Sequence, residues 1–451
     1  MYFLSSMFPE KVAIQDTDRS LTFSQLHEEI NVHSRQLKKL PQGILILEAS
    51  PTVRFAIQLM AALHINKPVA LFSNTLTEQE WDSRVSLLNK AMTVDEMGNL
   101  LELYQHNASP YHPQLALILF TSGTTGQVKA VQLSHKNIES NCHAVIKALQ
   151  FSRVEDQLLF LPLSYSFGLL GQLLPALMAG LSTQLISQFT DIKNILETEQ
   201  VPQMWSGVPS HWVAISKMTR LYPQSVARIA SIVSAGAPLP LSLRTELTTV
   251  FRNAIIYNNY GLTEASPRVL TYSSEDVLFS ENYAGYPVGD WQLRLSEESE
   301  LLIQGSQIML GYLGDEHNEK IDKGWLHTGD IAEILPSGLV AIKGRRDNQV
   351  NIGGEKVNLT EIEQKLCLMD GIREVVVLPV TDELYGIRLI ACFEQSVIAP
   401  QLTEQQLTEK IQLHLLPRKL PISVRLVDHL PRNQHGKLDR TMLKGLLTFQ
   451  Q

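Results

Sequence analysis

The chain has 451 residues, and its 38 Lys and Arg residues against 46 Asp and Glu residues give a formal net charge of −8 at pH 7. Because 44% of the residues are hydrophobic and only 19% are charged, the composition is that of a globular protein and excludes a disordered, collagen-like or coiled-coil chain. The mild acidic excess gives no electrostatic footprint for a nucleic acid, although backbone amides and a few cations can still bind phosphate locally.

The use of cysteine favours a reducing compartment, which we expect to be the cytoplasm. Cys142, Cys367 and Cys392 lack the Cys-x-x-Cys spacing of a zinc site, and an odd, sparse set argues against a disulfide framework. Residues 1–9 are apolar but carry no basic region, so they make a poor signal peptide.

The first predicted elements alternate between strand and helix. Thr22 is a candidate N-cap because Gln25 follows three residues later, as in a capping box. Alternation of this kind predicts a parallel sheet with helices on both faces. The expected strands cover residues 12–14, 43–47 and 69–72. One expected helix opens near Leu21, and a second covers residues 55–63.

The same alternation returns after residue 115. Between Asp156 and Asp191 no charged residue or histidine occurs, which by length alone would suggest a membrane span. Prolines and glycines interrupt this stretch, so we interpret it as buried core. The expected strands cover residues 115–120, 158–161, 203–206, 229–234 and 253–258, and a helix covers residues 137–149.

The pattern changes near residue 285, where short alternating runs indicate small β units, and after about residue 346 it restarts as α+β. The charged run Arg345-Arg346-Asp347 is the best domain boundary, and it divides the chain into residues 1–345 and 346–451. The expected strands cover residues 292–295, 301–304, 339–343, 375–379 and 389–393, and the helices cover residues 361–368 and 404–415.

The first chemical signal is the run Thr121-Ser122-Gly123-Thr124-Thr125-Gly126-Gln127-Val128-Lys129, directly after a predicted strand. Its two glycines allow a tight turn, its hydroxyls and successive N–H groups can surround phosphate oxygens, and its lysine adds positive charge. The Gly-Lys-Ser/Thr order of a Walker loop is absent. Taken alone, the run could also be a surface turn rich in Ser, Thr and Gly.

This run resembles the signature loop of the adenylate-forming superfamily, which contains acyl-CoA synthetases, nonribosomal-peptide adenylation domains and beetle luciferase. The family's loop usually ends in Pro-Lys-Gly, whereas this chain has Val128-Lys129-Ala130. Other segments resemble further motifs in the family's order, so the likeness extends from residue 121 to residue 438. They are Ser234-Ala235-Gly236-Ala237-Pro238, Asn259-Tyr260-Gly261-Leu262-Thr263-Glu264, Gly324-Trp325-Leu326-His327-Thr328-Gly329-Asp330, Gly344-Arg345-Arg346-Asp347 and Pro431-Arg432-Asn433-Gln434-His435-Gly436-Lys437-Leu438.

The residue patterns and the resemblance together predict an α/β fold. A large N-terminal AMP-binding domain, with two βαβ-type subdomains and a small β-barrel-like unit, would precede a small, mobile α+β C-terminal domain. The resemblance implies an ATP- or AMP-binding set of Thr121, Ser122, Gly123, Thr124, Thr125, Gly126, Lys129, Gly236, Ala237, Pro238, Asn259, Tyr260, Gly261, Asp330 and Arg345.

The resemblance also implies particular roles. Tyr260 would stack on adenine, Thr263 would meet the α-phosphate, and Glu264 would hold Mg²⁺ as a hard oxygen ligand. Asp330 and Arg345 would bind the ribose. Each segment has an ordinary interpretation as well, since Asp330 could cap a turn and Thr263-Glu264 could start a helix.

The implied reaction has two steps. A carboxylate attacks the α-phosphate of ATP to give an acyl-adenylate and pyrophosphate, and a thiol then attacks the acyl carbon and releases AMP. The catalytic residues would be Lys437, Thr263 and Glu264, with Lys437 bridging the two anions of the first step. Lys437 could instead be a solvated surface lysine.

A rotation of the C-terminal domain would separate the two steps. Asp347 would be the hinge, and Gly353 and Gly354 would line the thiol tunnel, where no side chain would obstruct the pantetheine arm. Many relatives have lysine where Asn351 stands, and Gly353-Gly354 could simply form a hairpin turn.

The acyl pocket would be lined by Tyr165, Phe167, Trp205, Ala235 and Gly261. No acidic residue occurs from residue 157 to residue 190, so the ammonium group of an amino acid would be unpaired there. We therefore expect a neutral aryl or medium aliphatic acid. Phe167 and Trp205 could equally be aromatic residues of the core.

The expected protein is an AMP-forming acid–thiol ligase that uses ATP, Mg²⁺ and coenzyme A, as acyl-CoA synthetases in biosynthesis do. Loading of the acid onto the phosphopantetheine thiol of an acyl carrier protein stays open, as does a non-catalytic nucleotide-binding relative. We expect a small-molecule carboxylic acid as substrate, no nucleic acid or membrane partner, and a monomer or homodimer.

Overall fold

The computed structural model describes residues 4–122, 128–198, 200–315, 320–352, 355–382, 386–395, 401–414, 421–432 and 438–448. The chain divides into two compact units. Unit 1 comprises Met1–Arg294, Leu302–Thr328 and Leu335–Val340, and unit 2 comprises Leu295–Leu301, Gly329–Ile334 and Ala341–Gln451. The expected boundary at residues 345 and 346 stays a prediction.

One of the two large sheets of unit 1 has nine strands, in the order β15-β14-β13-β12-β11-β9-β10-β1-β2. From β13 to β1 every neighbouring pair is parallel, while β14, β15 and β2 pair antiparallel at the two edges. The strands are β1 (Val12–Gln15), β2 (Ser20–Thr22), β9 (Asp156–Leu159), β10 (Ser182–Leu185), β11 (Met204–Gly207), β12 (Ser231–Ser234), β13 (Ile255–Gly261), β14 (Arg268–Ser273) and β15 (Tyr286–Pro287).

A seven-stranded sheet forms the other half of unit 1, in the order β18-β8-β7-β4-β3-β5-β6. Its centre, β5-β3-β4-β7, is parallel, and β6, β8 and β18 pair antiparallel. The strands are β3 (Ile44–Ala49), β4 (Val69–Ser73), β5 (Lys90–Val94), β6 (Leu100–Gln105), β7 (Leu115–Ser122), β8 (Val128–Ser134) and β18 (Gly311–Tyr312).

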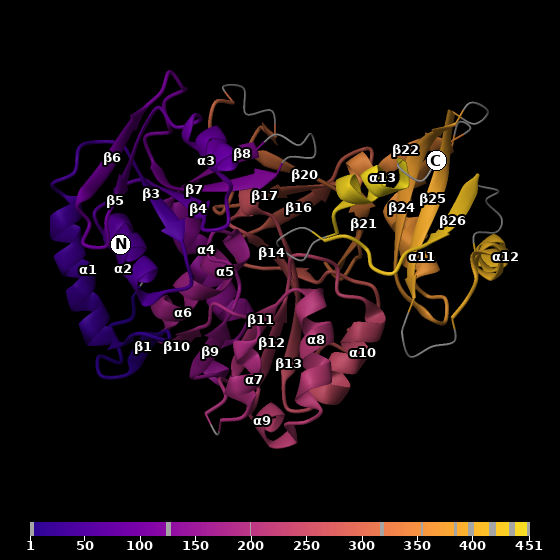
Figure 1. The fold of residues 1–451 in the computed structure, drawn as a ribbon, viewed down its shortest axis with the longest axis horizontal. Helices are drawn as coiled ribbons and strands as arrows, with labels where there is room; N and C mark the ends of the chain where they lie inside the picture. Colours follow the sequence, from indigo (N-terminus) through magenta and orange to yellow (C-terminus); the bar gives the residue numbers. More distant parts are fainter. Residues whose placement is uncertain are drawn as a thin grey trace. The chain divides into compact units, whose positions relative to one another are not determined.

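Amphipathic helices cover these sheets, and α8 and α10 lie beside β11 to β13 (Figure 1). The predicted capping box opens α1, since Thr22 accepts from the Gln25 N–H and the Gln25 side chain accepts from the Thr22 N–H. The α-helices of unit 1 are α1 (Phe23–Leu37), α2 (Val53–His64), α3 (Glu78–Val85), α4 (His135–Ala148), α5 (Ser166–Gly168), α6 (Leu174–Ala179), α7 (Asp191–Leu196), α8 (Pro209–Thr219), α9 (Pro223–Arg228) and α10 (Leu241–Val250). Short 3₁₀ or π turns are η1 (Phe151–Arg153), η2 (Leu169–Leu173) and η3 (Thr263–Ala265).

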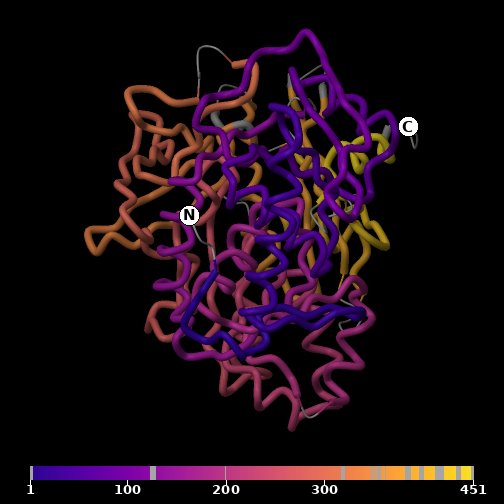
Figure 2. Tube along the Cα trace, turned by 90° about the vertical axis from the view of Figure 1, so that its left-hand side faces the viewer, coloured from indigo at the N-terminus to yellow at the C-terminus, as the bar shows by residue number. Residues whose placement is uncertain are grey.

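The first strand does not belong to the sheet of the strands that follow it. β1 pairs with β10, about 170 residues later in the chain, whereas β3 and β4 belong to the other sheet. In Figures 1 and 2 the indigo β1 segment accordingly lies beside magenta segments. The alternating pattern identified the strands but could not assign them to sheets, because β pairing depends on residues distant in sequence.

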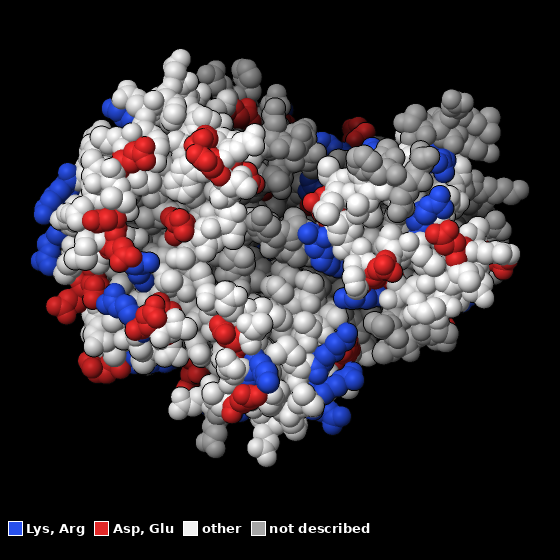
Figure 3. Space-filling view, viewed as in Figure 1, with Lys and Arg blue, Asp and Glu red and all other residues white. Residues whose placement is uncertain are grey.

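The uncharged stretch between Asp156 and Asp191 is core, as predicted. It contains β9, α5, η2, α6 and β10, and Leu169, Leu170 and Leu173 are fully buried. Within the described residues, no helix is long and apolar enough to cross a bilayer. On the face shown in Figure 3, basic and acidic side chains are interspersed over the N-terminal part of the chain.

Four strands each contain residues of both units, so the unit boundaries fall inside them. They are β16 (Gln292–Leu295), β17 (Glu300–Gln304), β20 (Trp325–Ile334) and β21 (Val340–Arg345). Together with β19 (Ile321–Asp322) these form a small five-stranded sheet. The rest of unit 2 contains the hairpin β22-β23 and a three-stranded sheet β24-β25-β26 packed by helices, so the predicted α+β pattern is confirmed. Its elements are η4 (Arg346–Asn348), β22 (Gln349–Ile352), β23 (Glu355–Asn358), α11 (Leu359–Leu366), β24 (Ile372–Asp382), β25 (Gly386–Gln395), α12 (Glu404–His414), β26 (Ile422–Leu426) and α13 (Arg440–Thr448).

Candidate active site

Two of the predicted site segments begin at one edge of the nine-stranded sheet. β11, β12 and β13 are adjacent and parallel, so their carboxyl ends at Gly207, Ser234 and Gly261 lie along the same edge. The N–H of Ala235 donates to the Gly207 carbonyl, 3.3 Å away, and joins two of the turns. Ligands of open α/β sheets bind beyond the carboxyl ends of the strands, which makes this edge the expected site.

The turn after β12 exposes Gly236, Ala237 and Pro238, while Ala235 is buried. Gly236 has a φ of +85°, a conformation that favours glycine. The side-chain N–H of Asn259 donates to the Ser234 carbonyl at 3.1 Å, and the side-chain oxygen of Asn259 accepts from the Thr271 hydroxyl. Asn259 therefore connects the start of this turn to β14.

The end of β13 can accept only glycine. A Cβ atom on Gly261 would lie 2.0 Å from the Pro267 carbonyl oxygen, because the chain turns back into β14 at this point. Tyr260, the predicted adenine-stacking residue, directly precedes Gly261 and is half-buried. Gly261 itself is exposed, which leaves an open surface at the strand end.

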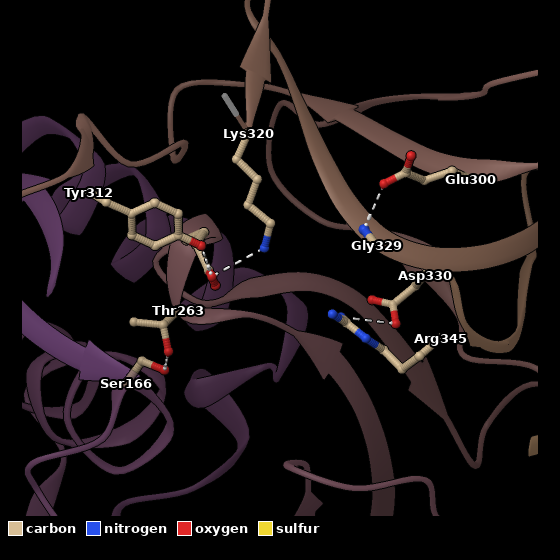
Figure 4. A network of polar contacts seen from close by, with 9 residues as sticks. Ser166, Thr263, Glu300, Tyr312, Lys320, Gly329, Asp330 and Arg345 are labelled. Carbon is tan, nitrogen blue, oxygen red and sulfur yellow. Dashed lines mark hydrogen bonds and ion pairs between the residues drawn. The ribbon is translucent and has the colours of Figure 1, made fainter. Parts of the chain in front are cut away.

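Glu264 is a buried carboxylate with two polar partners in unit 1. The Tyr312 hydroxyl donates to Oε1 at 2.6 Å, and the Lys320 ammonium lies 3.3 Å from the same oxygen. Figure 4 shows both groups pointing toward one carboxylate. Burial alone would raise the pKa of Glu264, but the Lys320 charge and the Tyr312 hydrogen bond outweigh it and hold the pKa below its usual value. The carboxylate is therefore ionised at neutral pH.

Thr263 forms a hydroxyl pair with Ser166, whose Oγ lies 3.1 Å from Thr263 Oγ1 (Figure 4). Ser166 opens α5, directly after Tyr165 and before Phe167. Because Thr263 and Glu264 are adjacent in η3, two hydroxyls and a carboxylate meet at this end of the sheet.

The described ends of the predicted phosphate run belong to β7 and β8, where Thr121 pairs with Lys129. Lys129 is exposed, and its ammonium lies 4.8 Å from the centre of the Tyr312 ring. Tyr312 therefore connects the lysine of this run to Glu264. The predicted residues Gly123, Thr124, Thr125 and Gly126, and the side chain of Ser122, lie outside the described part of the structure.

Unit 2 contains the predicted ribose pair. The Arg345 guanidinium lies 3.3 Å from Asp330 Oδ1, and Asp330 is buried on β20. The buried Glu300 accepts from the Gly329 N–H at 2.8 Å (Figure 4), and it also accepts from Arg346 at 2.8 Å. Glu300 thus fixes the backbone next to Asp330.

The acyl-pocket prediction needs one correction. Trp205 is fully buried in the core with Leu158 and Ile232, and its indole N–H donates to the Pro202 carbonyl at 2.7 Å. The side chain on this parallel strand points into the helix-covered core, so we no longer place Trp205 on the pocket. Phe167 and Tyr165 are half-buried at the site, and burial raises the pKa of Tyr165 to about 12.

Several predicted residues are not tested by the structure. Lys437, Gly353 and Gly354 lie outside the described residues. Asp347 lies in η4, but its side chain is not described. On either side of Gly353 and Gly354, β22 and β23 pair antiparallel, with Ile352 opposite Glu355. Their roles stay predictions.

Comparisons with known proteins show the family of this chain. The family of AMP-binding enzymes matches residues 79–313, more than half of the chain, and the C-terminal domain of AMP-binding enzymes matches residues 361–437. The chain belongs to the AMP-binding enzyme family.

Relatives of this AMP-binding enzyme include CoA ligases. A 2-succinylbenzoate–CoA ligase of Bacillus pumilus (strain SAFR-032) is 27% identical, in an alignment that covers 97% of this chain and 95% of that protein. A feruloyl-CoA synthase of Amycolatopsis sp is 28% identical over 349 residues, which cover 73% of this chain and 69% of that protein.

Solved structures confirm the predicted fold. ATP-bound MatB from Rhodopseudomonas palustris matches with a TM-score of 0.84 at 20% identity, over 97% of this chain and 96% of that chain. The o-succinylbenzoate CoA synthetase MenE from Bacillus subtilis, in complex with the acyl-adenylate OSB-AMP, matches with a TM-score of 0.78 at 22% identity, over 97% and 96% of the two chains.

The residues of this AMP-binding enzyme fit Mg²⁺ through Glu264. Its carboxylate is ionised, and both side-chain contacts reach Oε1. Among the described residues, no group of three or more His, Cys, Asp or Glu side chains could hold a metal. Mg²⁺ favours one or two carboxylates with substrate phosphates and water, so a single glutamate suits a metal that arrives with a nucleotide.

Sequence patterns missed several polar residues that contact the predicted motifs within each unit. Tyr312, Lys320 and Glu300 had no motif that singled them out. Ser166 lies between Tyr165 and Phe167, two residues expected in the acyl pocket, but was not itself predicted. Their importance comes from contacts between segments that are distant in the chain. Buried Glu300 was the hardest to foresee, since an isolated glutamate in a strand is ordinarily solvated.

Proposed function

We propose that this protein uses ATP to activate a carboxylic acid as its acyl-adenylate, with release of pyrophosphate, and then transfers the acyl group to the thiol of coenzyme A. The main support for the proposal is the buried carboxylate of Glu264 beside the Thr263–Ser166 hydroxyl pair, at the carboxyl edge of a parallel sheet. Two relatives are named as a CoA ligase and a CoA synthase, and these names support CoA as the acceptor.

In the first step, the carboxylate oxygen of the acid attacks the α-phosphorus, and the bond to the pyrophosphate oxygen breaks. The Thr263 hydroxyl would donate to an α-phosphate oxygen, and Ser166, 3.1 Å away, would hold that hydroxyl in place. Lys129 and Lys320 would offset charge on the phosphates. Positioning and charge stabilisation supply most of the catalysis in such phosphoryl-centred reactions.

Glu264 would hold Mg²⁺ together with phosphate oxygens. The metal would supply positive charge that stabilises the departing pyrophosphate. Tyr312 donates to Oε1 and so restricts the rotation of the carboxylate. Since Tyr312 also lies against Lys129, it orients two groups that would face the same phosphates.

The second step would use a different arrangement of the C-terminal domain. Lys437 would neutralise the approaching anions in the first step and then leave with its domain, about the hinge at Asp347. Gly353 and Gly354 would then admit the pantetheine arm, and the thiolate would attack the acyl carbon and expel AMP. Hinged domain closures around ligands are a common type of conformational change in enzymes.

The acid would be aryl or medium aliphatic, as the half-buried Phe167 and Tyr165 and the names of the relatives suggest. Tyr260 would stack on adenine, and Asp330 with Arg345 would bind the ribose. We place the reaction in the cytoplasm, where ATP and CoA are available, and expect a monomer or a homodimer.

The direct test is pyrophosphate release across a panel of carboxylic acids, followed by mass spectrometry of the products with CoA. We expect acid-dependent release and an acyl-CoA product. Adenylation without acyl-CoA, but with loading of a carrier protein, would move the acceptor to the carrier. Nucleotide binding without any pyrophosphate release would contradict the proposal.

A further inference from the structure

Two arginines are buried in unit 1, and they differ in their partners. Arg244 is 3% exposed and donates to four backbone carbonyls, those of Leu239, Phe279, Glu281 and Tyr283, at 2.7 to 3.2 Å. Arg268 is 2% exposed, and none of its three guanidinium nitrogens has a hydrogen-bond partner among the described residues. Arg244 is therefore a structural clamp, whereas the charge of Arg268 is left without compensation.

The backbone of Arg268 is held by two buried side chains at the start of β14. Its N–H donates to Asn141 Oδ1 at 3.2 Å, and its carbonyl accepts from the Trp291 indole at 2.7 Å. As the first residue of β14 it pairs with Gly261, at the end of β13. The side chain thus starts at the carboxyl edge where the site lies.

The guanidinium is directed toward the predicted acyl pocket. Its central carbon lies 5.8 Å from the centre of the Phe167 ring, and one terminal nitrogen lies 3.3 Å from where a Cβ of Gly171 would be. Phe167 follows Ser166, which contacts Thr263 at the reaction centre. A Cβ at Gly171 would therefore crowd this nitrogen and the Phe167 ring.

An unpaired buried cation is strongly unfavourable, and proteins compensate such charges with an anion. No acidic residue occurs from residue 157 to residue 190, and no described acidic side chain forms an ion pair with Arg268. A guanidinium matches a carboxylate with two parallel hydrogen bonds. The compensating anion would therefore be supplied by the ligand.

We propose that Arg268 binds a second carboxylate of the acid substrate, so that the enzyme selects dicarboxylic acids, one end of which reacts while the other pairs with Arg268. This inference rests on the proposed function and replaces the neutral acyl group that the sequence suggested. Arg268 is a recognition residue here, and it takes no part in the bond changes.

The test compares matched acids with the full-length enzyme. Straight-chain and aryl dicarboxylic acids are paired with counterparts whose second carboxylate is a methyl group, and kcat/KM for pyrophosphate release is measured. We expect the wild type to prefer the diacid of the best pair by about 30-fold or more, the scale of a buried, hydrogen-bonded charge pair. A wild type that prefers the monoacids, or shows no preference, would overturn the proposal without any variant.

Three variants then assign the preference. Arg268→Met should remove it while leaving kcat/KM for the monoacid within about 3-fold, and Arg268→Lys, which keeps the charge but loses the paired geometry, should retain part of it. Arg244→Met, the matched control, should lower the melting temperature and leave the diacid-to-monoacid ratio unchanged. Equal losses on both acids in Arg268→Met would show that Arg268 is structural.

The possible results distinguish a failure of the Arg268 proposal from a failure of the proposed adenylating activity. If no acid in the panel releases pyrophosphate, the adenylating activity itself is wrong. If monoacids release pyrophosphate and diacids do not, the activity stands and the recognition role of Arg268 is refuted. If Arg268→Met does not fold, the wild-type ratio and the Arg268→Lys ratio still decide.

Discussion

The ammonium nitrogen of Lys320 lies 3.3 Å from Oε1 of Glu264, and their side chains are only 26% and 11% exposed. The pair keeps the glutamate ionised in a buried place, which is the state required of a ligand for Mg²⁺. It also means that a metal would have to share this carboxylate with a cation already present.

Replacing the carboxylate tests the metal assignment. Glu264→Gln keeps the size and the hydrogen bond to Tyr312 but removes the charge, so pyrophosphate release should fall by about 10²-fold or more and require more Mg²⁺. The measurement is the initial rate over a titration of MgCl₂. Glu275→Gln, at an exposed ion pair with Arg153, is the control and should behave as the wild type.

Removing Lys320 should have two opposite effects. In Lys320→Met the repulsion between the ammonium and Mg²⁺ disappears, so half-saturating Mg²⁺ near pH 8 should fall by about 3- to 10-fold. The pKa of Glu264, which Lys320 lowers, should rise, so activity should be lost at a higher pH on acidification. A pH profile with unchanged acid limb would show that Lys320 does not control this carboxylate.

The ribose pair gives a binding test. Asp330→Ala should weaken ATP binding by about 10-fold or more, because a charged hydrogen-bond acceptor is lost. Glu333→Gln lies on the same strand, β20, at an exposed pair with Lys343, and should leave ATP affinity unchanged. Calorimetric titration with ATP measures both. Wild-type affinity in Asp330→Ala would remove this residue from the nucleotide site.

Lys437 separates the two half-reactions. Lys437→Ala should slow adenylation by about 10²-fold or more, and it should spare thioester formation from preformed acyl-adenylate, because the domain would have rotated away by then. Lys444→Ala, at an exposed position of α13, is the control. Equal losses in both half-reactions would rule out the rotation.

His211 predicts a pH-dependent stability. Its ring packs against Phe160 and Phe189 at 5.3 and 5.2 Å between centres, and burial lowers its pKa to about 4. Below about pH 6.5 the unfolded chain binds a proton that the folded chain does not, so the free energy of unfolding falls as pH decreases toward 4.

His211→Gln removes this proton. From pH 7 to pH 5 the wild type should lose about 2 kcal/mol more unfolding free energy than the variant. Urea denaturation at both pH values measures the difference, and parallel losses in the two proteins would show that His211 is protonated in the folded state.

The sequence was most informative where a local rule applies. Thr22 and Gln25 identified the start of α1, and the apolar run after residue 115 identified β7, because capping and periodicity depend on nearby residues. The sheet that receives β1 could not be predicted, and the sequence left Trp205 open between the pocket and the core, since both depend on pairing between distant segments. The same holds for the contacts of Glu264 with Tyr312 and Lys320, which approach it from about 50 residues away.

Exchange of labelled pyrophosphate into ATP, measured with and without carboxylic acids and in the absence of CoA, shows whether the enzyme forms an acyl-adenylate. The account predicts exchange that depends on the acid and on Mg²⁺ and that is lost in Glu264→Gln. Exchange that ignores the acid, or none with any acid although ATP binds, would contradict it.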